Sequence, residues 1–331
     1  GEPRLRLRGV RTGAARLAAE AKGRPGGVTF SPPVLDIWGL TSAVGPKGQG
    51  REEERGKFSI GGMTGFALRD GGVEFPNDNS VLGVGRTPEE VAAVLSAGNL
   101  PTDKVSLSLQ PLLVKLGGRV LLFDTGAGTA MGEGAGHLLA AMEEAGVKPS
   151  DVTDVFISHL HADHVGGLID AEGNRVFTNA TIRISDTEWE TLKGLNARTA
   201  ANFGLPNHKQ IEIAIGPDAA PFKVGGDVLP GLVRSVDVKG HTPGHSAFRI
   251  GTGSSALLYI GDAMHHHLVS VQKPEWKISF YSNGDVGAAS RASLLEELAT
   301  SNQRIYAVHF PFPGIGRIQK TDSGYTWVPE K

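Results

Sequence analysis

The chain has 331 residues, of which 40% are hydrophobic and 21% are charged, a composition typical of globular proteins. Its 33 lysines and arginines are balanced by 35 aspartates and glutamates, so no global positive field is available to hold nucleic acid. The absence of cysteine excludes disulfides, thiolate zinc sites and cysteine nucleophiles, so any metal must be held by nitrogen and oxygen atoms. No apolar run reaches the length of about 18 residues that a membrane span requires.

The first 57 residues differ from the rest of the chain. Their basic residues are scattered among alanine, glycine and proline, and only Glu2 and Glu20 oppose them before residue 30. No continuous apolar segment follows, so a secretory signal peptide is not present as written, and both a cytoplasmic and an exported location stay open. We expect residues 1–57 to be a poorly ordered basic extension, rich in glycine and proline, and residues 58–331 to form a single domain.

Short apolar runs broken by glycine and aspartate predict strands after this extension. They lie at residues 58–60, 63–68, 73–75, 112–116 and 119–123. Their spacing is typical of an antiparallel meander, in which Gly117 and Gly118 form a two-residue hairpin turn. Further strands are predicted at residues 155–158, 181–184, 232–238, 256–260 and 305–308.

Helices between these strands are predicted from their first and last residues. The segment Thr87–Glu90 matches a capping box with proline at the first helical position, and Gly98 ends that helix. Residues 137–145 have an amphipathic pattern, and the segment Ser185–Glu188 matches a second capping box. Residues 194–209 lack clear periodicity and are interpreted as a lid or pocket wall.

Metal-binding residue types are concentrated directly after the predicted strand at 155–158. The segment His159–His164 (HLHADH) contains three histidines and one aspartate, with Leu160 and Ala162 as spacers. Because a strand that ends here leaves the following residues on a loop, the four side chains can converge on one point, as a metal site requires. A solvated polar loop is the alternative, but it would rarely place these residues in this order after a buried strand.

The same arrangement recurs after three later strands, where His241, Asp262 and His309 follow apolar runs. Four repetitions indicate a site built from strand ends. Asp124 also follows a strand, and we expect its carboxylate to accept a hydrogen bond near the metal loop, with capping of its own turn as the alternative. His245 is expected to support the site rather than to bind metal.

The complete set of metal-capable residues resembles that of the metallo-β-lactamase superfamily in residue type and order. The resemblance covers the chain from about residue 58 onward, and it implies an α/β (α+β) fold, the αββα sandwich. It implies that one divalent ion is held by His159, His161 and His241 and a second by Asp163, His164 and His309, with Asp262 as the bridge. Zinc is the expected metal, and manganese, iron or cobalt would accept the same ligands.

Within the superfamily, the closing segment 309–316 and the tail 324–329 look like the branch of methyl parathion hydrolase and related lactonases. The resemblance implies that a hydroxide shared by two ions attacks a lactone, an aryl ester or an organophosphate triester. Asp163 and Asp262 would be the catalytic carboxylates, with Asp163 orienting the hydroxide or receiving a proton. The alternatives are a quorum-quenching acyl-homoserine lactonase and a metal-binding member of the fold without turnover.

Further residues are candidates for the surroundings of the metals. Quorum-quenching lactonases of the superfamily have a tyrosine three residues after the bridging aspartate, where this chain has His265. His265 is therefore a candidate proton donor, with an exposed polar run at 265–267 as the alternative. Apolar residues that flank the metal loops in sequence are candidates for the pocket: Met131, Trp189, Phe203, Met264 and Leu268. The expected partner is a small-molecule substrate, with neither nucleic acid nor membrane, and the resemblance includes a homodimer among the expected arrangements.

Overall fold

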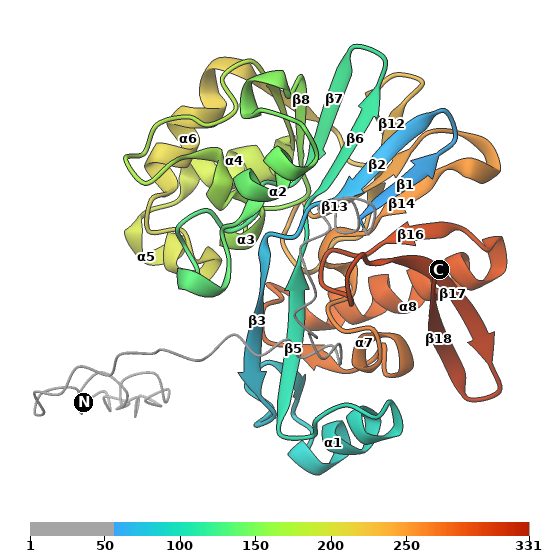
Figure 1. The fold of residues 1–331 in the computed structure, drawn as a ribbon. Helices are drawn as coiled ribbons and strands as arrows, with labels where there is room; N and C mark the ends of the chain where they lie inside the picture. Colours follow the sequence, from blue (N-terminus) through green and yellow to red (C-terminus); the bar gives the residue numbers. More distant parts are fainter. Residues whose placement is uncertain (1–55, 331) are drawn as a thin grey trace, which may run out of the picture. The chain divides into compact units, whose positions relative to one another are not determined.

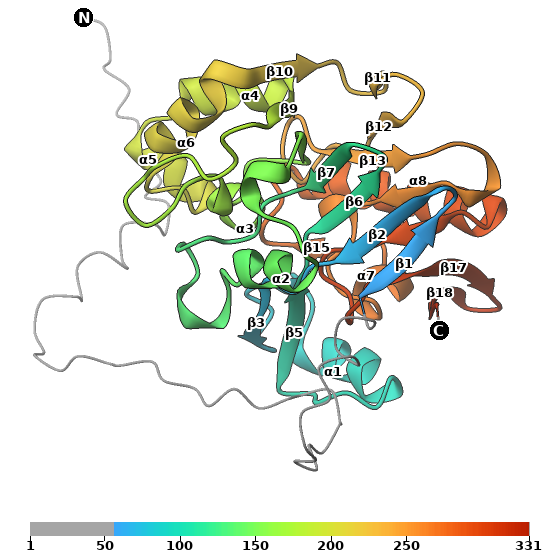
Figure 2. The same ribbon diagram turned by 45° about the horizontal axis from the view of Figure 1, so that its top comes forward.

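The computed structural model describes residues 56–330 of the chain. The predicted basic extension lies outside the described residues except for Gly56 and Lys57, and the first strand, β1 (Lys57–Ile60), begins next to the predicted boundary. Figures 1 and 2 show the strands of this part in the middle, with helices on both sides. None of the helices formed by residues 56–330 is long and apolar enough to cross a membrane.

The first of two seven-stranded sheets has the order β1-β2-β6-β7-β8-β9-β10. Its other strands are β2 (Met63–Ala67), β6 (Leu112–Leu116), β7 (Arg119–Phe123), β8 (Asp154–Ile157), β9 (Thr181–Ser185) and β10 (Ala219–Phe222). The predicted hairpin at Gly117 and Gly118 is confirmed, since Leu116 pairs with Arg119. The strands β7 to β10 pair in parallel. Their carboxyl ends therefore meet at one edge of the sheet, where ligands bind in open α/β sheets.

The second sheet has the order β11-β12-β13-β14-β16-β17-β18. Its strands are β11 (Asp227–Leu229), β12 (Val233–Asp237), β13 (Ser246–Ile250), β14 (Leu257–Tyr259), β16 (Arg304–Tyr306), β17 (Ile315–Thr321) and β18 (Gly324–Pro329). The central pair β14 and β16 is parallel. Because of this pairing, the segments that carry Asp262 and His309 leave the sheet at the same edge.

Alternation along the strands assigns the side chains to layers. In β8, Phe156 lies between the two sheets and stacks on Phe123 with ring centroids 4.6 Å apart, whereas Val155 contacts the outer layer. In β14, Tyr259 lies between the sheets and Leu258 faces outward. Each sheet therefore has two apolar faces, and the outer one requires a cover of helices.

Helices cover both outer faces of this pair of sheets (Figure 1). The first sheet is covered by α2 (Leu138–Glu144), α4 (Asp186–Gly194) and α6 (His208–Ile215). The second sheet is covered by α8 (Gly284–Ser301), whose Leu294, Leu295 and Leu298 are buried against it. This arrangement confirms the predicted αββα sandwich.

The predicted meander is wrong at one strand. The strand β3 (Gly71–Pro76) does not join the first sheet but pairs with β5 (Lys104–Leu109), for which no strand was predicted, in a separate two-stranded sheet. The chain leaves the main sheet after β2 and returns to it at β6, so the neighbour of β2 in the sheet is β6 and not β3. The excursion has its own small core, and Figure 1 shows β3 and β5 reaching away from the main sheets toward α1 (Pro88–Ala97).

The excursion also contains the first predicted helix. Thr87 caps α1, its hydroxyl accepts the N–H of Glu90, and the Glu90 carboxylate accepts the N–H of Thr87, so the capping box is confirmed. The short elements β4 (Leu82–Val84), β15 (Lys277–Ile278) and α7 (Val269–Gln272) complete this part of the fold. Leu95 of α1 and Leu107 of β5 pack in the same core, which joins the helix to the two-stranded sheet.

Candidate metal centre

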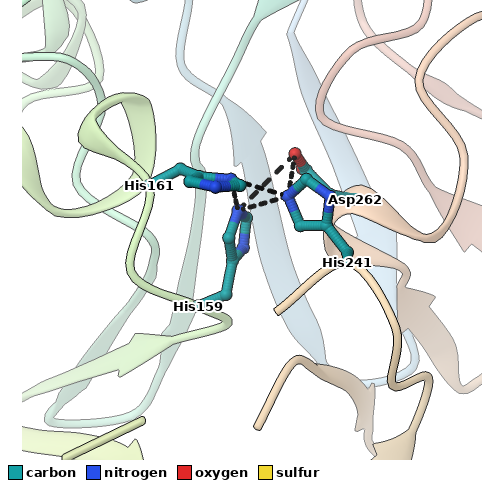
Figure 3. Close-up of side chains that lie close together, drawn as sticks. All are labelled: His159, His161, His241 and Asp262. Atoms are coloured by element: carbon teal, nitrogen blue, oxygen red, sulfur yellow. Dashed lines mark hydrogen bonds and ion pairs between the residues drawn. The ribbon is translucent and has the colours of Figure 1, made fainter. Parts of the chain in front are cut away.

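All seven predicted metal ligands lie together at the carboxyl ends of the strands. They form two groups, and the ligand atoms within each group lie within 4.8 Å of one another. The first group is His159, His161, His241 and Asp262, and the second is Asp163, His164 and His309. Figure 3 shows the three imidazole rings of the first group pointing toward one another and toward the carboxylate of Asp262.

The first group is a convergence of three imidazole nitrogens. Nδ1 of His161 lies 2.7 Å from Nε2 of His241 and 3.1 Å from Nε2 of His159. Burial lowers the pKa of His159 and of His241 well below the ordinary value, and it lowers the pKa of His161 to about 4. These rings are therefore neutral near pH 7, and a neutral imidazole has the lone pair that a divalent metal binds.

Asp262 faces both groups, one oxygen to each. Its Oδ2 lies 3.1 Å from Nε2 of His241, and its Oδ1 lies 3.1 Å from Nε2 of His164 and 3.0 Å from Nε2 of His309. Burial opposes ionisation, but the surrounding histidines, His164 first, hold the pKa of Asp262 well below its usual range. An ionised carboxylate in this position has the geometry of a bridge between two cations.

Asp163 and His164 of the second group lie on one helical turn rather than on the open loop expected from the sequence. His161 is the residue before α3 (Ala162–Val165), which contains both Asp163 and His164. Oδ2 of Asp163 lies 3.4 Å from Nε2 of His164 and 3.7 Å from Nε2 of His309. Despite burial, His164 and His309 lower the pKa of Asp163 to about 2. The turn explains how six consecutive residues supply ligands to two different groups.

Asp124 contacts His164, a member of the second group, and two residues close to it. Its carboxylate accepts hydrogen bonds from the backbone N–H of Ser158 at 2.7 Å, from Nδ1 of His164 at 2.7 Å and from the hydroxyl of Tyr259 at 2.6 Å. His309 is fixed in the same way, since its Nδ1 donates to the carbonyl of Ser108 at 2.9 Å. With Nδ1 occupied, each ring presents Nε2 to the metal, as is usual for metal-binding histidines.

His245 and His265 have different positions around Asp262. Nδ1 of His245 donates to the carbonyl of Val238, and its Nε2 accepts the backbone N–H of Asp262, both at 3.0 Å. Nε2 of His265 lies 3.1 Å from Oδ2 of Asp262, and its ring stacks on that of His309. His265 and His266 are both buried, so an exposed polar run is wrong for these two residues.

The residues fit a divalent metal. Nε2 of His164, Oδ1 of Asp262 and both ring nitrogens of His265 are buried, and no contact that they make with the described residues has full hydrogen-bond geometry. Buried polar atoms that lack partners cost free energy, so native structures rarely leave several in one place unless a ligand satisfies them. The donors are imidazole nitrogens and carboxylate oxygens, a set that binds zinc, manganese, iron or cobalt. The cluster therefore indicates divalent metal binding.

A cavity of about 790 Å³ opens over the two groups, and it tests the predicted pocket residues. Met131 and Phe203 line it, and the segment 194–209 supplies part of its wall. Trp189, Met264 and Leu268 do not line it, which corrects the prediction for these three. Trp189 packs on the helices over the first sheet, Met264 is buried under the second sheet, and Leu268 packs against the core beside α1.

Sequence reasoning missed most of the cavity wall. Val73, Phe75 and Leu107 come from β3 and β5, and Phe280 and Tyr281 come from the segment before α8. Alternating apolar residues at 105, 107 and 109 were a signal for β5, but nothing in the sequence indicated that β3 and β5 turn toward the metal centre.

Glu188 departs from its predicted role. Ser185 caps α4 by accepting the N–H of Glu188 at 3.2 Å, but the carboxylate does not return to Ser185. It accepts the N–H of Leu160 at 3.0 Å and that of Gly244 at 2.6 Å. The second capping box is thus half formed, because the carboxylate is bound by the two metal loops. Burial raises the pKa of Glu188 to about 6, against the opposing effect of the Thr242 hydroxyl and of the two backbone hydrogen bonds.

This raised pKa predicts a pH dependence of stability. The pKa of Glu188 rises from 4.5 in the unfolded chain to about 6 in the fold, so the folded state binds the proton more tightly. Its contribution is fully present below pH 4.5 and is lost as the pH rises through about 6, by roughly 2 kcal/mol in total. We expect urea unfolding of the metal-free protein to show this loss relative to Glu188→Gln, and a difference that does not vary with pH would contradict it.

Comparisons with known proteins agree with this geometry. Residues 111–298, more than half of the chain, match the family model of the Metallo-beta-lactamase superfamily. A probable metallo-hydrolase of Mycobacterium tuberculosis is 26% identical over 216 residues, which are 56% of this chain and 67% of that protein. An N-acyl homoserine lactonase of Bacillus cereus is 30% identical over 126 residues, 38% of this chain and 43% of that protein, so the match spans less than half of the lactonase.

Two solved structures are similar over most of the chain. AidC, described as a dizinc quorum-quenching lactonase, has a TM-score of 0.77 and 28% identity, and the match covers 83% of this chain and 97% of AidC. The hydrolase AbOPH has a TM-score of 0.73 and 28% identity over the same shares of the two chains, 83% and 97%. On the family match, the fold and the order of the residues at its sheet edges, the chain belongs to the metallo-β-lactamase superfamily.

Proposed function

We propose that this metallo-hydrolase cleaves small neutral esters that carry an apolar group, a class that includes lactones, aryl esters and phosphotriesters. One observation carries the proposal: two groups of metal-binding side chains share Asp262 at the floor of a cavity with apolar walls. We infer that His159, His161 and His241 hold one ion and Asp163, His164 and His309 hold the other, with zinc as the first candidate. Divalent ions bound there would supply positive charge for the reacting oxygen and lower the pKa of a nearby water.

The protein's own groups would bind and orient the reactants. Asp163 borders the cavity and, with its pKa lowered to about 2, is ionised near neutral pH, so its carboxylate can orient the attacking water or accept its proton. Asp262 and His265 also border the cavity, and the His265 ring lies where it can contact the polar end of a substrate. No side-chain nucleophile is needed in this scheme.

The walls favour a neutral substrate. Val73, Phe75, Phe203 and Phe280 surround the space above the metal centre, and no lysine or arginine is among the described residues that line it. An anionic substrate would therefore have no side-chain cation with which to pair outside the metal centre. An apolar acyl or aryl group would instead gain free energy by leaving water for these walls.

A substrate panel tests the proposal. The purified protein, loaded with zinc or manganese, is assayed against lactones, aryl esters and phosphotriesters, with the free metal ion as the background. Turnover of at least one class above background is expected. Acyl-homoserine lactones are included because the likeness to AidC and to the Bacillus lactonase favours them as a second candidate. If no substrate is turned over, the hydrolase proposal is wrong and a metal-binding role without turnover is favoured. A homodimer stays a prediction, which sedimentation would test.

The apolar wall predicts a chain-length effect. Replacing Phe203 with alanine is expected to raise KM for esters with long acyl chains by about 10-fold, because the ring would no longer cover the apolar group. The matched control is a short-chain ester with the same variant, for which KM should change little. Steady-state kinetics with both esters measure the effect, and an equal change for the two esters would exclude Phe203 from the binding of the apolar group.

A further inference from the structure

We propose that Glu188 is a positioning residue, which sets the spacing between His159, His161 and His241 without touching a metal ion itself. The inference rests on the proposed metal centre, and it concerns a residue outside the ligand set. The Glu188 carboxylate accepts hydrogen bonds from two backbone N–H groups. Each of these groups belongs to one of the two loops that carry the first group of ligands.

Both contacts are made by backbone groups that lie close to the candidate ligands in the sequence. Leu160, which donates to Oε2 of Glu188, stands between His159 and His161, and Gly244, which donates to Oε1, follows His241 by three residues. The first loop follows β8 of the first sheet and the second follows β12 of the second sheet. One carboxylate therefore ties together two loops that come from different sheets and whose imidazole nitrogens must meet within about 3 Å.

Gly244 gives independent evidence that the loop after His241 packs closely against α4. A Cβ atom at Gly244 would lie 2.4 Å from the hydroxyl of Ser185, 2.8 Å from Cβ of Thr187 and 2.9 Å from the backbone nitrogen of Glu188. The Ser185 hydroxyl also donates to the carbonyl of Gly244 at 3.0 Å. The loop after His241 is thus seated directly on the first turn of α4, with no room for a side chain.

The charge of Glu188 is also unusual for a merely structural residue. The side chain is fully buried, and no hydrogen bond from a lysine or arginine reaches its carboxylate within residues 56–330. Burying a carboxylate without a cation costs free energy, and a leucine or glutamine would fill the same volume at lower cost. The carboxylate therefore acts through the groups that it binds, which are backbone N–H groups close to the proposed metal ligands. Outer residues of this kind change metal affinity by about 10- to 100-fold when they are replaced.

The test measures metal affinity rather than turnover. Glu188→Gln keeps the size of the side chain, but its amide NH₂ faces one of the two N–H donors and loses that contact. The matched control is Glu190→Gln on the same helix, where the glutamate is exposed and pairs with Lys193. Zinc and cobalt affinities are measured by competition with a chromogenic chelator, and the cobalt absorption band reports the geometry of the ligands. Measurements in a His309→Ala background, which keeps the first group complete, assign the loss to that group.

We expect Glu188→Gln to lower the affinity of the first group by about 10-fold or more and to change its cobalt spectrum. The second group and the Glu190→Gln control should change little. Unchanged affinity, or an equal loss at both groups, would overturn the proposal. If Glu188→Gln does not fold, Glu188→Asp keeps the charge but is too short for both contacts, and the same loss is expected. Failure of both variants to fold would show that the carboxylate serves the fold itself. Absence of turnover in a wild-type protein that binds metal would reject the proposed function alone.

Discussion

The Asp262→Ala variant is expected to lose turnover by on the order of 1,000-fold and to lose a large part of its bound metal. The Asp262 carboxylate faces both ligand groups, with oxygens 3.1 Å from His241 and 3.0 Å from His309. Without it, each group keeps three ligands, but nothing connects them, and the two cations would repel each other without a shared negative charge.

The variant is measured by elemental analysis together with steady-state kinetics on the best substrate of the panel. Asp227→Ala is the control, because Asp227 lies exposed on β11 and pairs with Arg234 at the surface. Two metals per chain and a normal rate in Asp262→Ala would show that the bridging assignment is wrong. Asp262→Asn is a useful intermediate, since it keeps the shape and one oxygen ligand but removes the charge.

Removal of the metal is expected to abolish turnover and to lower the melting temperature. Three imidazole nitrogens lie within 3.1 Å of one another in the first group, an arrangement that a bound cation satisfies and that neutral rings alone do not. A metal present at about 100 times its Kd would stabilise the fold by about 2.7 kcal/mol, so chelation should lower Tm by roughly 5–10 °C.

Calorimetry and activity assays before and after dialysis against a chelator measure both effects. Zinc should restore the activity and the melting temperature, whereas magnesium should not, because it prefers oxygen ligands over imidazole. A chelated protein that keeps both its rate and its melting temperature would contradict a metal centre at this site.

The clustering of the candidate ligands could be predicted from the sequence because each of their loops follows the end of an apolar strand. Strand ends are visible as a change from apolar to polar residues, as at Ile157 to His159, and parallel pairing then brings them to one edge. The αββα sandwich was predicted from the family resemblance, which rests on the order of the histidines and aspartates. The number of strands alone would not select this fold. The capping box at Thr87 also depends only on residues close together in the sequence, and it was confirmed.

Contacts between distant segments could not be predicted in this way. Glu188 has the spacing of a cap, and only the packing of α4 against two loops shows that its carboxylate binds elsewhere. Phe280 lines the cavity although it is far in sequence from every metal loop, whereas Met264, two residues after Asp262, is buried away from it. No helix was predicted over α8, in which alanine, serine and glycine fill half of the 18 positions and weaken the apolar periodicity.

The division of the two sheets along the chain has a consequence for folding. The first sheet takes its strands only from residues 57–222 and the second only from residues 227–329. His159 to His164 belong to the first half, and His241, Asp262 and His309 belong to the second. An ion bound by both halves is therefore a cross-link between two consecutive pieces of chain, and it would slow amide hydrogen exchange in β8 and β14 together, making the two sheets open as one cooperative unit.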